Sequence, residues 1–247
     1  SAVSYNDLTD KDQIVNKDAV SMLVSLGIIE GKPDGSYAPT ENVDRAQMAK
    51  MLSVIMNKGV DNSALYQSVN SGLVDVNTNW AKGHINYCYT TGIIAGRGNG
   101  TFDPSATVTA LEAAKMLLVA VGYDPAIEGF EGADWAINVS VRADEQGIFE
   151  GFTKDLSAPL NRDDAALLIY NALDVEMIQS YTTNNYPIVY SDHRTILSDK
   201  YGVIKVQGVV VANEWASLAS DDGDAALKEG KTTIYNGEGI FSTTGNT

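Results

Sequence analysis

Apolar and polar residues follow one another with helical spacing over much of the first two thirds of the chain. An apolar stripe with a period of roughly 3.6 residues consists of Ile14, Ala19, Met22, Leu23 and Leu26. It predicts an amphipathic helix followed by Gly27, a residue type suited to the left-handed position just past a helix end. Further helices are predicted over residues 43–56, 108–121 and 160–173. The pattern therefore favours a mostly α fold for this part of the chain.

These helices belong to a unit that occurs three times. Segments 27–31, 92–96 and 147–151 each read glycine, isoleucine, an apolar residue, a variable residue and glycine. The first two copies continue with an Asp-Gly or Asn-Gly turn, whereas the third keeps only Pro159. Because one copy cannot bury its apolar stripe alone, the three must share a core. We expect repeats over residues 1–62, 63–124 and 125–180, within a compact helical domain that ends near residue 180.

The character of the sequence changes after that point. Runs rich in β-branched residues at 188–190, 203–206, 209–211 and 231–235 predict strands. We expect a small β-rich segment over residues 181–247, which can be part of a longer domain. Its sequence indicates no function.

Composition excludes several classes of function. With 17 basic and 32 acidic residues the net charge is −15, which argues against nucleic acid as a partner. No apolar run approaches the roughly 18–20 residues of a membrane span, and the first residues do not resemble a signal peptide. One cysteine and two distant histidines predict neither a disulfide framework nor a zinc site. We therefore expect no metal, no cofactor and no membrane span.

Two arginines occupy an unusual position in the repeated unit. Arg45 and Arg162 directly follow the predicted N-cap residues of their helices, and Ala110 takes this place in the second copy. A cation at a helix N-terminus is electrostatically unfavourable. One explanation is an ion pair with an acid on a neighbouring helix. The other is an anion site in which the guanidinium and the free N–H groups of the helix start converge on a carboxylate or phosphate.

The repeated motifs resemble the S-layer homology (SLH) domain of bacterial surface proteins. The family signature Thr-Arg-Ala-Glu is matched by the segments 44–47, 109–112 and 161–164, and residues 73–76 followed by Trp80 are similar to the family's opening motif. The resemblance covers about residues 5–175. It implies three repeats packed as a pseudo-threefold helical spindle around a shared core. It also implies inter-repeat grooves that bind a secondary cell wall polysaccharide attached to peptidoglycan, often through a pyruvylated, hence anionic, sugar.

The resemblance also implies a set of ligand-binding residues. It assigns the anion to the signature arginines, sugar hydroxyls to acids of the opening loop, the groove wall to tryptophans and close backbone approach to loop glycines. To these we add the cations that follow the glycines. In the same order, the residues are Arg45 and Arg162, Asp7 and Asp75, Trp80 and Trp135, Gly31 and Gly96, and Lys32 and Arg97.

The copies depart from the family pattern in different places. Ala110 removes the arginine from the second copy, so we expect its groove to be weak or empty unless Arg97 substitutes. The first copy has Val15 where the others have tryptophan, and the third lacks the Asp-Gly turn. One or two working grooves are therefore expected.

The sequence as a whole favours a non-catalytic anchor at the bacterial cell wall or S-layer, outside the cell. One alternative is a structural module for S-layer assembly, with other S-layer subunits as partners. Another is the anchor of a surface enzyme whose catalytic domain lies outside this chain. No paired-carboxylate or nucleophile constellation is present in the sequence, so we expect no enzymatic activity.

Overall fold

The computed structural model describes residues 3–206, 209–213, 231–235 and 240–244. The chain divides into two compact units, residues 1–202 and 203–247. Each unit is described by itself. None of the helices in the described ranges has both the length and the apolar character needed to cross a membrane.

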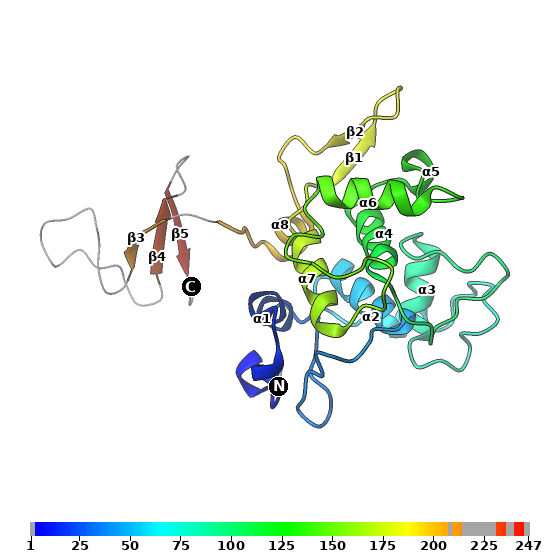
Figure 1. Cartoon of the computed structure of the whole chain (residues 1–247), viewed down its shortest axis with the longest axis horizontal. Helices are drawn as coiled ribbons and strands as arrows, with labels where there is room; N and C mark the ends of the chain where they lie inside the picture. Colours follow the sequence, from blue (N-terminus) through cyan, green and yellow to red (C-terminus); the bar gives the residue numbers. More distant parts are fainter. Residues whose placement is uncertain (1–2, 207–208, 214–230, 236–239, 245–247) are drawn as a thin grey trace, which may run out of the picture. The chain divides into compact units, whose positions relative to one another are not determined.

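The first unit is built mainly from helices. Helix α4 packs against both α2 and α7, and α1, α3 and α6 pack on these three helices (Figure 1). In chain order the helical elements are η1 (Tyr5–Asp7), η2 (Lys11–Gln13), α1 (Lys17–Ser25), α2 (Arg45–Met56), η3 (Ser63–Tyr66), α3 (Lys82–Thr90), α4 (Ala110–Val121), α5 (Pro125–Glu128), α6 (Trp135–Glu145), α7 (Arg162–Ala172) and α8 (Ile196–Tyr201).

The local signals for helix ends are confirmed. The side chains of Asp44, Thr109 and Asn161 each accept a hydrogen bond from the backbone N–H three residues later, at 2.7, 3.1 and 2.8 Å, and so cap α2, α4 and α7. The glycines after the first helix of each copy, Gly27, Gly92 and Gly147, have φ values of 73°, 79° and 73°. These are left-handed conformations that glycine adopts without steric cost. The helices predicted over residues 43–56, 108–121 and 160–173 begin and end within two residues of α2, α4 and α7, whereas Ile14 of the predicted first stripe lies before α1.

The three copies interlock in a closed cycle. The first helix of each copy packs on the second helix of another: α1 on α7, α3 on α2 and α6 on α4. At the start of the second helices, Val43 N–H donates to Leu160 O, Leu160 N–H to Val108 O and Val108 N–H to Val43 O, at 2.8–2.9 Å. These three residues are at most 2% exposed. A ring of backbone hydrogen bonds thus joins all three copies inside the core.

The first unit continues past the boundary expected near residue 180. Strands β1 (Ile178–Tyr181) and β2 (Pro187–Val189) form an antiparallel pair, and α8 follows them. The Tyr181 hydroxyl accepts from Asp124 N–H at 2.9 Å, and the Tyr201 hydroxyl donates to Ile55 O at 3.1 Å. These contacts tie the segment to the helical core, which is why the compact unit ends at Gly202.

The second unit contains a three-stranded antiparallel sheet in the order β3 (Val209–Asn213), β4 (Lys231–Tyr235) and β5 (Ile240–Thr244). In its register, Ile234 lies opposite Val210 on one side and Phe241 on the other. The strands predicted at 209–211 and 231–235 are confirmed, whereas residues 203–206 form no strand. The remainder of this segment lies outside the described residues.

Candidate functional site

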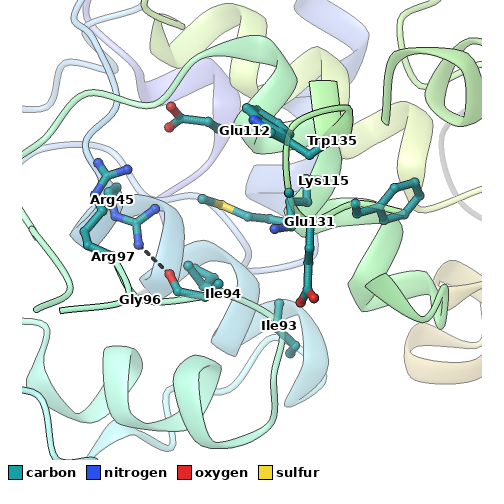
Figure 2. Close-up of a pocket in the computed structure, with 14 residues that line it drawn as sticks. Arg45, Ile93, Ile94, Gly96, Arg97, Glu112, Lys115, Glu131 and Trp135 are labelled. Atoms are coloured by element: carbon teal, nitrogen blue, oxygen red, sulfur yellow. Dashed lines mark hydrogen bonds between the residues drawn. The ribbon is translucent and has the colours of Figure 1, made fainter. Parts of the chain in front are cut away.

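Two grooves in the first unit are built from equivalent parts. Groove A lies between loop 28–35, α2, Trp80 and Arg162, and encloses about 660 Å³. Groove B lies between loop 93–98, α4, Trp135 and Arg45, and encloses about 540 Å³. Figure 2 shows groove B, with the guanidinium groups of Arg45 and Arg97 on one side and Trp135 and Lys115 across from them.

Each groove draws on all three copies of the repeat. The loop and second helix come from one copy, the arginine from another and the tryptophan from the third. Groove B therefore carries the loop of the second copy with Arg45 of the first, and the expectation that this groove lacks a signature arginine is wrong. Ala110 instead lies beside the third copy, where Leu111 N–H donates to Leu156 O at 3.1 Å.

The two arginines are held by backbone carbonyls and stacked on aromatic rings. Arg45 donates from Nε to Phe102 O (2.8 Å) and from Nη2 to Ala95 O (2.7 Å), with its guanidinium 4.4 Å from the Phe102 ring centre. Arg162 donates from Nε to Tyr37 O (2.7 Å), and its guanidinium lies 4.8 Å from the Tyr37 ring centre.

Neither arginine forms an ion pair with an acid among the described residues, so the explanation by a neighbouring-helix salt bridge is wrong. Because a carbonyl oxygen carries no net charge, both guanidinium groups keep their full positive charge at the groove wall.

The backbone N–H groups at the helix starts are not available to a ligand. Arg45 N–H donates to Ala106 O and Ala46 N–H to Pro104 O, both at 2.9 Å. In the same way Arg162 N–H donates to Glu41 O at 2.9 Å. The predicted contribution of free helix-start amides to the anion site is therefore wrong. An anion in either groove must be held by side chains.

Cations gather in groove B. Burial first, and the neighbouring Arg97 second, lower the pKa of Arg45 to about 10, so its guanidinium stays charged at neutral pH. Burial and the charge of Arg45 lower the pKa of Lys115 as well, although Glu131 opposes this shift. Arg97 itself lies 3.4 Å from Asp103 Oδ2. An anion bound beside Arg45 and Lys115 would oppose the lowering of their pKa values.

Groove A contains lysines at the positions equivalent to the cations of groove B, and each of them forms an ion pair with a nearby glutamate. Lys50 Nζ lies 3.1 Å from Glu30 Oε2, and Lys32 pairs with Glu41. Lys50 and Lys115 line their grooves at equivalent positions, although the family resemblance does not assign them to the site. The repeat offset could have identified them, because the two lysines are separated by the same 65 residues as Gly27 and Gly92.

The predicted tryptophans and loop glycines line the two grooves. Trp80 is 59% exposed in groove A, and Trp135 is half-buried in groove B. Gly31 and Gly96 line the same grooves. A Cβ on Gly96 would lie 3.1 Å from Thr101 O and 3.2 Å from the Tyr89 ring. A side chain at this position would therefore be tightly packed against its own loop and the Tyr89 ring.

The two predicted acids, Asp7 and Asp75, have different surroundings in the structure. Asp7 is exposed, accepts from Ser4 N–H and is not among the described residues that line groove A. The equivalent of Asp75 is Asp10, which lies 65 residues before it. Both oxygens of each carboxylate accept backbone N–H groups, from Tyr37 and Ala38 at Asp10 and from Phe102 and Asp103 at Asp75, at 2.7–2.8 Å.

Each groove also contains a buried acceptor without a protein partner. Gln47 Oε1 and Glu112 Oε2 are inaccessible to solvent and make no hydrogen bond within the described part of the chain. They occupy the third position of α2 and of α4. Buried polar atoms are nearly always hydrogen-bonded, so these two acceptors are exceptions beside the grooves.

The third set of equivalent positions has lost these features together. Ala110 stands in place of the arginine, Val15 in place of the tryptophan and Leu167 in place of the lysine. Ala110 is fully buried, and Val15 is 82% exposed. The residues that make grooves A and B cationic and aromatic are thus present twice as a set and absent once as a set.

Comparison with known proteins gives a consistent result. The S-layer homology domain family matches residues 4–49 and 74–114. A cell surface protein of Thermoanaerobacter kivui is 27% identical over 94% of this chain and 28% of its own length. An S-layer protein of Bacillus licheniformis is 32% identical over 46% of this chain and 12% of its own. The exoglucanase XynX of Acetivibrio thermocellus is 29% identical over 70% of this chain and 16% of its own. The chain thus spans less than a third of these relatives.

Proposed function

This chain is an S-layer homology domain protein of the bacterial cell surface, homologous to S-layer and cell surface proteins, and we propose that grooves A and B bind an anionic cell wall saccharide. SLH domains are typical of cell-wall anchoring and are not catalytic, and some relatives are enzymes with catalytic domains elsewhere. Binding in the grooves anchors the protein to the wall through a secondary cell wall polysaccharide.

The joint presence of arginine, lysine and tryptophan in two grooves, and their joint replacement in the third position, carries this proposal. Residues that served only the fold would be needed equally in all three copies, because the helices interlock in one cycle. Arginine, lysine and tryptophan instead occur together wherever they line the same groove. Two grooves bind ligand, and the third position, with Ala110, Val15 and Leu167, does not.

The chemistry of the grooves suits a pyruvylated amino-sugar. Each arginine donates two of its five N–H groups to carbonyls, and the other three have no hydrogen-bond partner within the described residues. They can bind a carboxylate together with Lys50 or Lys115. A hydrogen bond to a charged group contributes about 1.5–3 kcal/mol. The tryptophan offers a flat apolar face to the sugar ring.

The acidic character of the protein does not prevent anion binding. The net charge of −15 produces long-range repulsion, but salt screens it beyond about 8–10 Å at physiological ionic strength. Contacts inside the groove act at much shorter range. We also infer that the cyclic packing of the three copies is the pseudo-threefold spindle implied by the family resemblance, since the helix contacts and the ring of backbone bonds support it.

The tryptophans allow a test that spares the core. Trp80→Ala combined with Trp135→Ala should reduce binding to purified cell wall sacculi by on the order of tenfold or more, because both sugar-stacking faces are lost. Val15→Ala is the matched control, since it alters the exposed residue of the first copy that stands in place of tryptophan at the third groove position, and it should leave binding unchanged. Far-UV circular dichroism checks the fold. Sacculi binding that survives in the double variant would contradict the proposal.

A further inference from the structure

In groove B, a carboxylate is connected to the groove arginine through one peptide segment. Asp75 accepts the N–H groups of Phe102 and Asp103 at 2.8 and 2.7 Å. The carbonyl of Phe102 then accepts Nε of Arg45 at 2.8 Å, and the ring of the same residue lies under the guanidinium. Phe102 therefore supplies both the carbonyl acceptor and the aromatic ring that hold Arg45. Asp75 in turn fixes the backbone of Phe102 by accepting hydrogen bonds from Phe102 N–H and Asp103 N–H.

Groove A repeats this arrangement with different side chains. Asp10 accepts the N–H groups of Tyr37 and Ala38 at 2.7 and 2.8 Å. Tyr37 O accepts Nε of Arg162 at 2.7 Å, and the Tyr37 ring lies under that guanidinium. The Tyr37 hydroxyl also donates to Arg162 O at 2.8 Å. The connection of acid, aromatic residue and arginine is thus built twice.

The held turn has an unfavourable backbone conformation. Ala38 and Asp103, which follow the aromatic residues, have φ values of 55° and 61°. Residues other than glycine rarely adopt this left-handed region, and they need support from the surrounding structure. The carboxylate supplies that support, because it accepts the N–H groups on both sides of the aromatic residue's carbonyl. Without the carboxylate, the turn can relax to a more favourable conformation. The carbonyl of the aromatic residue then no longer accepts the hydrogen bond from the arginine.

The third groove position, which combines the loop of the third copy with Ala110 of the second, lacks every part of this connection. Phe130 stands five residues before Trp135, where Asp75 stands before Trp80. Ser157 precedes Pro159 by two residues, as Tyr37 precedes Pro39, and Ala110 replaces the arginine. Acid, aromatic residue and arginine are therefore kept together or lost together, although turns form in all three copies.

We propose that Asp10 and Asp75 are positioning residues for anion binding, each acting on the arginine of its groove through one aromatic residue and not on the ligand itself. This inference rests on the proposed function of the grooves. It replaces the expectation that the acid of the opening loop accepts sugar hydroxyls. In this role the aspartate lies near the anion site, but its carboxylate does not contact the carboxylate of the bound sugar.

A double-mutant cycle tests the connection. In a Trp80→Ala background, which weakens groove A, calorimetry with a pyruvylated amino-sugar reports on groove B. Asp75→Ala should weaken binding on the order of tenfold, since the guanidinium loses its fixed orientation. In an Arg45→Ala background the same change should have no further effect. An additional loss there would mean that Asp75 contacts the ligand, and would overturn the proposal. Asp7→Ala is the matched acidic control and should change nothing.

A second readout needs no ligand. Exchange of the Arg45 Nε proton, followed by NMR, should become faster in Asp75→Ala and should recover partly in Asp75→Asn, which keeps one oxygen acceptor. The Arg162 Nε proton should be unaffected. Unchanged protection of Arg45 in Asp75→Ala would overturn the proposal. If the protection responds as expected but the unaltered protein binds no sugar, the proposed function fails while the positioning role stands.

Discussion

At the scale of single residues, Arg45 and Arg162 show how a charge can be fixed without being neutralised. Ion pairing with an acid would have held the side chains equally well, but it would have left little attraction for an anion. Carbonyl oxygens and aromatic rings hold the guanidinium groups while preserving their charge. The same arrangement explains why these arginines tolerate the unfavourable helix start.

Lys115 provides a residue-scale prediction. Its pKa is lowered by burial and by the charge of Arg45. A bound anion adds an opposite charge nearby, so saturating ligand should raise the pKa of Lys115 toward its ordinary value. NMR titration of the lysine side-chain signals measures the change, and Lys58, which lies outside both grooves, serves as the internal reference. No shift at Lys115 under saturating ligand would mean that groove B does not hold the anion.

At the scale of secondary-structure elements, two equivalent helix pairs differ in one polar cluster. Between α2 and α3, His84 Nδ1 lies 2.5 Å from Ser53 Oγ, and His84 Nε2 lies 3.6 Å from Asp61 Oδ2. Both His84 and Ser53 are buried. Between α4 and α6 the equivalent positions are Val139 and Leu118, which are fully buried and apolar. The natural sequence thus contains an apolar version of the same contact.

This difference predicts a pH effect on stability. Burial lowers the pKa of His84 below its usual 6.5, and Lys50 lowers it further, although Asp61 opposes the shift. Below pH 6.5 the unfolded state therefore binds more protons than the folded state, and stability falls until the pH passes the folded-state pKa.

The variant His84→Val with Ser53→Leu copies the α4–α6 pair. It should lose less thermal stability between pH 7 and pH 5 than the unaltered protein. Thermal unfolding followed by circular dichroism compares the two, and an equal loss in both would show that His84 is not responsible.

At the scale of the whole molecule, what could be predicted from the sequence depends on whether the interaction is local. Helix caps, glycine stops and the repeat itself were predicted correctly because each depends on a few adjacent residues. The grooves were assigned less well, because each one combines parts of three copies. Reading Ala110 with the loop of its own copy therefore gave the wrong groove.

Two other differences between expectation and structure have equally physical causes. The family resemblance indicates Asp7, whereas the 65-residue offset to Asp75 identifies Asp10 as the equivalent residue. The sequence predicts that the helical domain ends near residue 180, because runs rich in β-branched residues begin after that point. Strands β1 and β2 and helix α8 nevertheless pack on the helices through long-range contacts such as that of Tyr201, which a sequence pattern does not reveal.

Stoichiometry tests the central claim most directly, because the interlocked molecule presents three equivalent positions but only two complete sets of groove residues. Isothermal titration calorimetry with a pyruvylated amino-sugar, and with the same sugar lacking the pyruvate, counts the sites on the intact chain. Two sites for the anionic sugar and none for the neutral one are expected. Three equal sites, or equal binding of both sugars, would contradict a mechanism based on two cationic grooves.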